Sequence, residues 1–218
     1  MSTRQEEVSA ALVSVQEEIA SYSPTLIVVT KTYPVSDVEI LASLGVRDFG
    51  ENRNEEGIDK SPAVSARWHY QGEIQGKKIR SILSWAHCLH SLDSLDHAQK
   101  ISRTLSEDGR AIDLFLQLSL DGDPARGGVP ESGLLEMAEA ISALSGINLL
   151  GIMCVPPVTM EPSTAFFKIA QVHQGFKERF PQSPSLSAGM SQDYMLALEH
   201  GATHIRVGSK ILGKRTYP

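Results

Sequence analysis

The stretch that decides the fold is LIVVTK, residues 26–31. Its first five residues form a nearly continuous apolar and β-branched run, which is typical of a strand buried on both faces of a parallel sheet. Apolar residues recur at helical spacing over residues 6–20, so an amphipathic helix is expected before this strand. A second helix is expected after it, because Ser36 and Glu39 form a capping-box pattern and Gly45 suits the end of a helix. Helices on both sides of a buried strand indicate an α/β protein.

The same alternation continues to the end of the chain. Further strands are expected at residues 46–50, 68–71, 85–90, 112–118, 148–155, 185–187 and 204–207. Further helices are expected at residues 94–105, 131–145 and 163–180. About eight strands, each ~25–30 residues from the next, are typical of a (β/α)8 barrel of the TIM type. An open doubly wound sheet is the alternative, although no G-x-G-x-x-G follows the first strand. Residues 1–218 are expected to form a single domain.

Composition and charge exclude several classes of protein. The 218 residues are 41% hydrophobic, which is enough for one sizeable core, and no signal peptide or membrane-spanning stretch is visible. A net charge of −6 argues against nucleic acid as a partner, because nucleic-acid binders usually carry a basic stripe. Neither the histidines nor the two cysteines, Cys88 and Cys154, show the spacing of metal ligands. We therefore expect a cytoplasmic protein without a metal site, bound to neither nucleic acid nor membrane.

One residue is a candidate nucleophile. Lys31 ends the buried strand, and the active face of a (β/α)8 barrel lies at the carboxyl ends of its strands. A lysine in a desolvated pocket has a lowered pKa and can form a Schiff base with an aldehyde. The alternative is a strand-end lysine whose amine reaches solvent.

Two glycine-containing stretches near the end of the chain are typical of phosphate-binding loops. The first is GMSQD at residues 189–193, where Ser191 is expected to cap a helix, and the second is RVGS at residues 206–209. Loops after the seventh and eighth strands of a barrel often bind phosphate, and helix N-termini supply free N–H groups. Ordinary turns and caps are the alternative. Earlier in the chain, Glu51 and Asn52 either contact a ligand or cap the next helix.

Seven segments, in order along nearly the whole chain, resemble the pyridoxal 5′-phosphate (PLP) homeostasis proteins, whose fold is similar to the N-terminal barrel of alanine racemase. The segments are residues 28–34, 49–53, 68–72, 90–93, 151–153, 189–193 and 205–213. The resemblance implies a single barrel of PLP fold type III that lacks the C-terminal β domain of the racemases. The chain departs from the family's pattern at Gln71–Gln75 and at Arg126, where the family usually has a lysine before a glycine. Both departures concern the rim of the pocket.

The resemblance also implies the roles of the cofactor-binding residues. Lys31 would carry PLP as a Schiff base, and Arg206 would face the pyridine nitrogen of the cofactor. A protonated arginine there would disfavour a second positive charge on the ring, which makes PLP a weaker electron sink. The remaining cofactor-binding residues would be Ser191, Gly208 and Ser209 at the phosphate, with Asn52, His69 and Met190 along the pocket.

The expected function is to bind PLP and to take part in its intracellular homeostasis, by buffering or delivery, without turnover and without a catalytic residue. Racemisation needs a second acid–base group on the opposite face of the cofactor, which the racemase relatives supply from their C-terminal β domain. This chain ends at Pro218. We expect a monomer, with PLP-dependent apo-enzymes as recipients of the cofactor.

Two alternatives stay open. A PLP-dependent amino-acid racemase or decarboxylase-like enzyme would use Lys31 and a second group such as Tyr33, two residues away. A cofactor-free barrel such as an aldolase would use the same lysine for a Schiff base with its substrate, and would be colourless when purified.

Overall fold

The computed structural model describes residues 2–213, and its strands form one parallel sheet. The strands are β1 (Thr25–Val29), β2 (Asp48–Glu51), β3 (Arg67–Tyr70), β4 (Cys88–Leu92), β5 (Ile112–Ser119), β6 (Val129–Pro130), β7 (Ile147–Cys154), β8 (Ser185–Met190) and β9 (His204–Val207). Among the described residues their order is β4-β3-β2-β1-β9-β8-β7-β5-β6. An additional pairing of β4 with β5 closes eight of them into a barrel, while β6 pairs only with the end of β5. The expected (β/α)8 barrel is confirmed, and the open doubly wound sheet is excluded.

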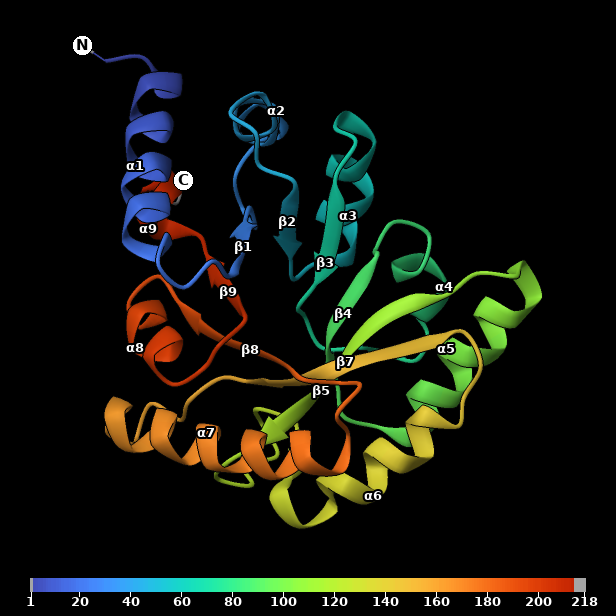
Figure 1. The fold of residues 1–218 in the computed structure, drawn as a ribbon. Coiled ribbons are helices and arrows are strands. Elements are labelled where there is room, and N and C mark those ends of the chain that lie inside the picture. Colours follow the sequence, from blue (N-terminus) through green and yellow to red (C-terminus); the bar gives the residue numbers. More distant parts are fainter. Residues whose placement is uncertain (1, 214–218) are drawn as a thin grey trace.

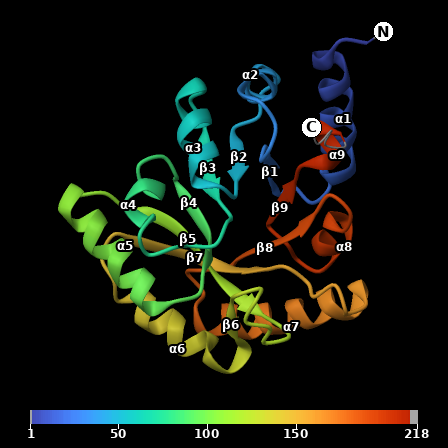
Figure 2. The same cartoon turned by 180° about the vertical axis from the view of Figure 1, so that it is seen from behind.

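The helices lie outside the ring of strands (Figures 1 and 2). They are α1 (Arg4–Ile19), α2 (Val35–Ser43), α3 (Asn54–Lys60), α4 (Ile79–Ile82), α5 (Leu95–Asp108), α6 (Glu131–Ser142), α7 (Pro162–Arg179), α8 (Tyr194–Glu199) and α9 (Ser209–Leu212), with a 3-10 helix at Ser61–Ala63. The buried residues of α1 form the predicted stripe, Val8, Leu12, Val15 and Ile19. Burying each such side chain contributes about 1.5–3 kcal/mol, so the helical layer is held mainly by apolar packing. No helix within residues 2–213 is both long and apolar enough to cross a membrane.

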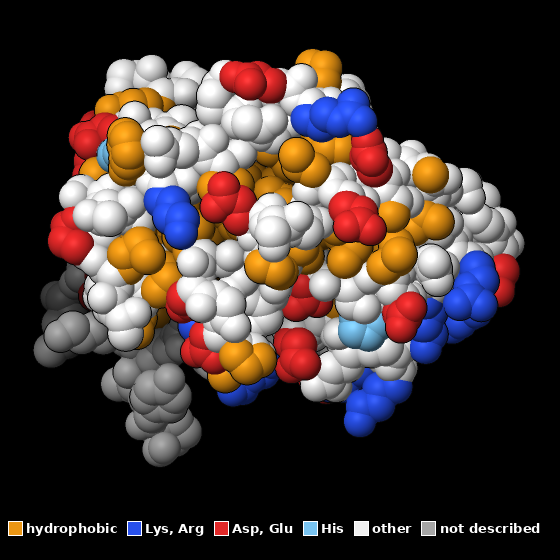
Figure 3. Space-filling model, turned by 90° about the horizontal axis from the view of Figure 1, so that it is seen from below, with side chains coloured by type: hydrophobic (Ala, Val, Ile, Leu, Met, Phe, Trp, Pro, Cys, Tyr) orange, Lys and Arg blue, Asp and Glu red, His pale blue; other side chains and the backbone are white. Residues whose placement is uncertain are grey.

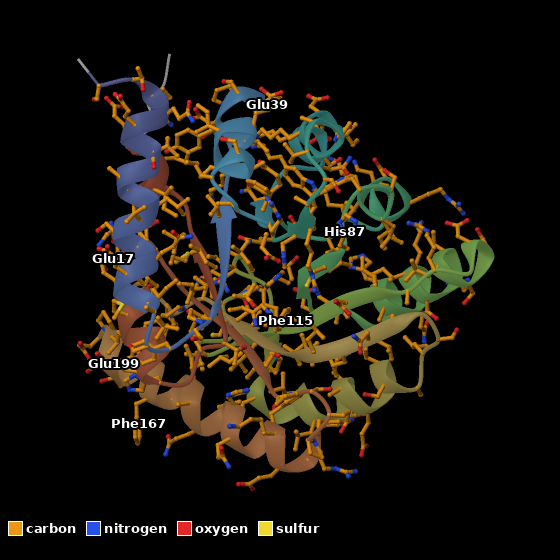
Figure 4. The ribbon with its side chains drawn as sticks, turned by 45° about the horizontal axis from the view of Figure 1, so that its top comes forward. Glu17, Glu39, His87, Phe115, Phe167 and Glu199 are labelled. Atoms are coloured by element: carbon orange, nitrogen blue, oxygen red, sulfur yellow. The ribbon has the colours of Figure 1, made fainter. Side chains whose placement is uncertain are left out.

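The inside of the barrel is more polar than its outer wall. Cys88, Phe115 and Met153 form a small apolar cluster there, and Figure 4 shows Phe115 within the ring of strands. Beside this cluster lie buried polar side chains, namely His69, His90, Ser187 and Arg206. A buried polar group is costly unless it is hydrogen-bonded, so the interior must contain a network that satisfies these groups.

The capping-box prediction for the second helix is wrong. The helix begins at Val35 with Pro34 as its N-cap, and no side chain caps it. Proline fixes its own φ near the value that an extended N-cap needs, so the chain enters the helix before Ser36 is reached. The predicted end is confirmed, because Gly45 has a φ of 95° just beyond the helix.

The fourth strand also lies further along the chain than predicted. Trp85 and Ala86 are buried, but they precede β4 and pack in the outer layer. The Trp85 indole donates to Asn54 Oδ1 of α3 at 3.0 Å. An apolar run alone does not distinguish a strand from a buried segment that packs against a helix.

Candidate functional site

Most of the predicted site residues gather on one arc of the carboxyl end of the barrel. Neighbouring strands place Val29 beside Gly50, Val28 beside Val207, and Met190 beside Arg206. The segments that leave β2, β1, β9 and β8 therefore lie next to one another. They carry Asn52, Lys31, Gly208 and Ser191 respectively.

Lys31 is half-buried and lies two residues beyond the end of β1. The next residue, Thr32, has a φ of 69°, which is the left-handed region that β-branched residues rarely adopt. The Thr32 N–H donates to Glu56 Oε2 at 2.6 Å, and this bond holds the unusual backbone in place. The backbone that carries Lys31 is thus fixed on its carboxyl side.

A buried ion cluster fixes the same backbone on the other side. Lys60 Nζ donates to the Thr30 carbonyl at 2.8 Å, to Glu51 Oε1 at 2.8 Å and to Glu56 Oε2 at 2.7 Å. The Thr30 hydroxyl also donates to Glu51 Oε1, at 2.6 Å. We call Thr30, Glu51, Glu56 and Lys60 the Lys60 cluster. It joins α3 to the ends of β1 and β2 and leaves little freedom to the main chain around Lys31.

The two carboxylates of the Lys60 cluster differ in their electrostatics. Burial raises the pKa of Glu51, although Lys60 and the Thr30 hydroxyl oppose that shift. Burial acts in the same direction on Glu56, but the hydrogen bonds from Lys60 and from the Thr32 N–H outweigh it and lower the pKa. The sequence reasoning missed this cluster. The only signal was the i,i+4 spacing of Glu56 and Lys60, which says nothing about burial.

Asn52 does not cap the next helix. The N-cap of α3 is Arg53, and no side chain bonds to the helix start. The Asn52 Oδ1 atom is buried and has no hydrogen-bond partner among the described residues. A buried acceptor without a partner is costly, so Asn52 is suited to contact a ligand. Met190, in β8 at the opposite end of the arc, is 40% exposed.

Ser191 joins the loops after β8 and β9. Its Oγ accepts from the backbone N–H of Gly208 at 3.1 Å and of Lys210 at 3.4 Å. The prediction that Ser191 caps a helix is wrong, because α8 begins at Tyr194 with Asp193 as its N-cap. Since the Ser191 oxygen accepts both N–H groups, its own proton is left to donate to a ligand. Ser209, the first residue of α9, is exposed.

Gly208 is required by close packing rather than by an unusual φ. A Cβ at this position would lie 2.9 Å from the carbonyl oxygen of Val29 in the neighbouring strand. The loop after β9 therefore passes against the end of β1, immediately before Lys31.

Arg206 is buried inside the barrel. Its Nη1 donates to Ser187 Oγ at 2.7 Å, and its Nη2 donates to the Cys154 carbonyl at 3.4 Å. Burial lowers the pKa of Arg206 to about 10, so the guanidinium remains protonated at neutral pH. A fixed positive charge thus lies beneath the arc that carries Lys31 and Ser191.

His69 lies deeper than the other predicted site residues. Its Nε2 is 3.0 Å from Asp48 Oδ1, and its Nδ1 is 2.9 Å from His90 Nε2. Asp48 begins β2, so the imidazole extends toward the amino end of the barrel, away from the expected pocket. Side chains alternate along a strand, and Gln71, two residues later, reaches the carboxyl end instead.

A cavity of about 670 Å³ occupies the other arc of the carboxyl end. Gln71, Asp93, Gln117 and Arg126 are among its lining residues. Arg126 is held by Asp121, at 2.7 Å, and by the Val155 carbonyl, also at 2.7 Å. Both departures from the family's pattern therefore lie on this rim.

A larger cavity lies at the opposite end of the barrel. It measures about 1050 Å³ and is lined by residues at the amino ends of strands, including Arg67 and Ile112. We favour the cavity of about 670 Å³ at the carboxyl end as part of the site, because active sites of (β/α)8 barrels lie at that face.

Three potential metal ligands meet in the barrel interior, which their sequence spacing does not reveal. His69, Cys88 and His90 are buried, and their ligand atoms lie within 4.8 Å of one another. The two ring nitrogens are 2.9 Å apart, whereas nitrogens that share a tetrahedral zinc stand about 3.3 Å apart. Burial also raises the pKa of Cys88, which disfavours the thiolate that a metal needs. The group is therefore a hydrogen-bonded part of the core.

Comparison with known proteins relates the chain to one family. Residues 7–216 match the family model described as alanine racemase, N-terminal domain. The pyridoxal phosphate homeostasis protein of Corynebacterium glutamicum is 42% identical over 201 residues, which cover 88% of this chain and 91% of that protein. That of Mycobacterium leprae is 32% identical over 240 residues, 96% of this chain and 93% of that protein. Among solved structures, PipY of Synechococcus elongatus has a TM-score of 0.88 without PLP and 0.87 with PLP bound, at 30% identity over 94% of this chain and 100% of that chain.

Proposed function

This chain belongs to the pyridoxal phosphate homeostasis proteins, within the alanine racemase N-terminal domain family, and we propose that it binds PLP through Lys31 and buffers or delivers the cofactor without turnover. The observation that carries the proposal is the position of Lys31. Lys31 lies just beyond β1, where Lys60 holds the Thr30 carbonyl on one side and Glu56 holds the Thr32 N–H on the other. The loops that Ser191 and Gly208 link lie beside it.

The side chains present fit the chemistry of PLP. When bound, the cofactor would supply an aldehyde, and Lys31 would hold it through its amine as a Schiff base, with release of water. The Ser191 hydroxyl and the backbone N–H of Ser209 would hold the phosphate, joined by the Gly208 N–H once it exchanges Ser191 Oγ for a phosphate oxygen. The unpartnered Asn52 Oδ1 would accept a hydrogen bond at the pocket wall. Met190, at the end of β8 on the opposite side of the arc, would also line the pocket, while the depth of His69 assigns it to the floor beneath the pocket.

Arg206 would make bound PLP a weaker electron sink. We assign its guanidinium to the ring nitrogen of PLP, where a permanent cation disfavours a second positive charge. Carbanion chemistry on PLP depends on electron withdrawal by the ring, so this arrangement favours holding the cofactor over using it.

Tyr33 is poorly placed for acid–base work opposite Lys31. Its hydroxyl donates to the Gly213 carbonyl at 2.7 Å, and its side chain is buried with the apolar core. A racemase would need an acid–base group above the cofactor plane, and Tyr33 is turned toward the end of α9 instead.

The first test is an absorbance spectrum of the purified protein before and after borohydride reduction, followed by peptide mapping. We expect a yellow protein whose reduced cofactor maps to Lys31. Lys31→Ala should abolish the label, whereas Lys100→Ala, an exposed lysine on α5, should keep it. A colourless protein that fails to take up added PLP would move the aldolase alternative to the front.

The second test addresses turnover. The PLP-loaded protein should show no steady conversion of any amino acid, and it should transfer PLP to an added apo-enzyme. Amino-acid turnover that disappears in Lys31→Ala would replace the carrier proposal with the racemase or decarboxylase alternative.

A cytoplasmic location and a monomeric state complete the proposal. Cys88 and Cys154 are both free and buried thiols, which suits a reducing compartment. On the face seen in Figure 3, apolar side chains are interspersed with charged ones, as on a surface that stays in solvent. Light scattering of the purified protein would test the monomer.

A further inference from the structure

A line of hydrogen-bonded side chains crosses the barrel interior from Arg206 to the amino end of β2. Arg206 Nη1 lies 2.7 Å from Ser187 Oγ, and the same oxygen lies 2.9 Å from His90 Nδ1. His90 Nε2 lies 2.9 Å from His69 Nδ1, and His69 Nε2 lies 3.0 Å from Asp48 Oδ1. We call these five residues the interior chain. It connects the charge beneath the proposed cofactor site to the opposite end of the barrel.

When both imidazoles are neutral, the Asp48 end of the interior chain fixes the direction of every bond in it. The Ser187 hydroxyl then donates to His90 Nδ1, while its oxygen accepts from Arg206, which can only donate. His90 therefore carries its proton on Nε2 and donates to His69 Nδ1. His69 in turn carries its proton on Nε2 and donates to Asp48, whose carboxylate can only accept. This is the one arrangement that satisfies every member of the interior chain with both imidazoles neutral.

The surroundings favour those neutral imidazoles. Burial holds the pKa of His90 well below its ordinary value, and positive neighbours lower it further. Burial also lowers the pKa of His69, against the influence of Asp48. The Phe115 ring stacks on His90 with 4.6 Å between centroids (its place is labelled in Figure 4). The titratable or charged groups that face the two rings are Asp48 from β2, Arg67 from β3, His87 and Cys88 at the start of β4, and His204 and Arg206 from β9.

The Asp48 end of the interior chain is accessible to solvent. The Asp48 side chain is 25% exposed, and with His69 and His204 it lines a cavity of about 370 Å³ at the amino end of the barrel. Solvent can reach the Asp48 carboxylate there, whereas Arg206 at the other end is buried. The interior chain thus has a buried cation, Arg206, at one end and a solvent-accessible carboxylate, Asp48, at the other. Two histidines are hydrogen-bonded between them.

We propose that Ser187, His90, His69 and Asp48 are positioning residues that lock the Arg206 guanidinium in the orientation it needs to face the ring nitrogen of PLP. The inference rests on the proposed function. Turning Arg206 away would break its bond to Ser187 Oγ, an oxygen that the hydrogen bond to His90 holds in place. The orientation of Arg206 is therefore set from the opposite end of the barrel.

The tautomers can be measured without PLP. In ¹⁵N-labelled protein at pH 7, the ring nitrogens of His69 and His90 should both report neutral imidazoles protonated on Nε2. Ser187→Ala should alter the His90 signals, and Ser185→Ala on the same strand should not. An imidazolium, or an Nδ1-protonated ring at either position, would overturn the interior chain.

The positioning role is tested on the PLP-loaded protein by the pH midpoint of its visible absorbance. Arg206→Ala should raise this midpoint, because the ring nitrogen then gains a proton more easily. Ser187→Ala should shift it in the same direction by about one pH unit, the change expected from losing one hydrogen bond to a charged group. Ser187→Thr keeps the hydroxyl and should restore the parent midpoint.

A double variant separates positioning from general loosening of the barrel. Adding Ser187→Ala to Arg206→Ala should cause no further shift, because the group that Ser187 positions is already gone. An unshifted midpoint in Ser187→Ala, or a shift that persists in the Arg206→Ala background, would overturn the proposal. Failure of borohydride to label Lys31 in the parent would instead refute the proposed function, while the tautomers would still decide whether the interior chain exists.

Discussion

Ser191 illustrates how much one hydroxyl oxygen can organise, because it accepts the N–H groups of Gly208 and Lys210 across two loops. Ser191→Ala removes this link and the proposed donor to the phosphate. We expect PLP to be retained about tenfold less well, while the absorbance of the remaining bound fraction is unchanged. Equilibrium dialysis measures the effect, with Ser185→Ala as the control. Retention equal to that of the parent would contradict the role of Ser191.

Arg206 should show the opposite division of effects. Arg206→Ala removes the charge proposed at the ring nitrogen but leaves the phosphate loops intact. The visible spectrum should therefore change more than the affinity for PLP does, as a titration followed by absorbance would show. A large loss of affinity with an unchanged spectrum would place Arg206 at the phosphate instead.

Gly208 is the residue for which packing alone makes a prediction. A Cβ would lie 2.9 Å from the Val29 carbonyl, so Gly208→Ala must push β9 away from β1 at a cost of about 1–3 kcal/mol. Gly175 on α7 is the matched control, since a Cβ there meets nothing within 4 Å. Gly175→Ala should stabilise the protein by about 0.5–1 kcal/mol, because glycine weakens a helix interior. Urea denaturation compares the two; a neutral Gly208→Ala would show that the loop can yield.

At the scale of elements, the Lys60 cluster holds α3 against the ends of β1 and β2. Lys60→Met leaves the buried Glu51 carboxylate without its cation, and breaking a buried pair in this way costs about 3–5 kcal/mol. The loss should be greatest at pH 7. The pKa of Glu51 is already raised by burial, so on acidification the folded variant takes up a proton before the unfolded chain does. The deficit relative to the parent should therefore shrink toward pH 5.

Two variants make that experiment decisive. Lys78→Met removes a cation from the exposed pair with Glu55 and should have little effect at any pH. Adding Glu51→Gln to Lys60→Met should recover part of the lost stability at pH 7, because the uncompensated charge is gone. A deficit that does not depend on pH would mean that lost packing, rather than the Glu51 charge, explains the Lys60 effect.

At the scale of the whole molecule, buried histidines should set the acid limit of stability. Burial lowers the pKa of both His173 and His204 to about 4, and that of His90 also lies well below its ordinary value. A depressed pKa means that the unfolded chain binds protons first. The stabilising contribution is therefore complete above about pH 6.5 and is lost as the pH falls toward 4.

Denaturation midpoints between pH 7.5 and 4.5 would reveal this loss. His173, which contacts the Pro184 carbonyl at 2.9 Å, offers a variant remote from the interior chain. His173→Gln should lower stability at pH 7 but flatten its dependence on pH. A parent protein equally stable at pH 7 and pH 5 would contradict the expected linkage.

The amino-acid sequence by itself determined the alternation of strands and helices, the position of Lys31 at a strand end and the two glycine-containing loops near the C-terminus. These features depend on local periodicity and on residues whose chemical role can be inferred from the neighbouring sequence, such as a lysine after an apolar run. It did not determine the ends of short elements. The second helix begins at Val35, earlier than predicted, with Pro34 as its N-cap. The buried Trp85 was predicted to lie in the fourth strand but precedes it.

Only the tertiary structure decided which of these residues meet. Closure of the barrel sets β9 beside β1, which brings Gly208 against the end of the strand that carries Lys31. Closure of the barrel also brings the buried Lys60 and His69 side chains to partners distant in the sequence, the Thr30 carbonyl and Asp48. No local pattern encodes such contacts, because burial and hydrogen-bond partners depend on which strands become neighbours, and that follows from closure of the whole sheet.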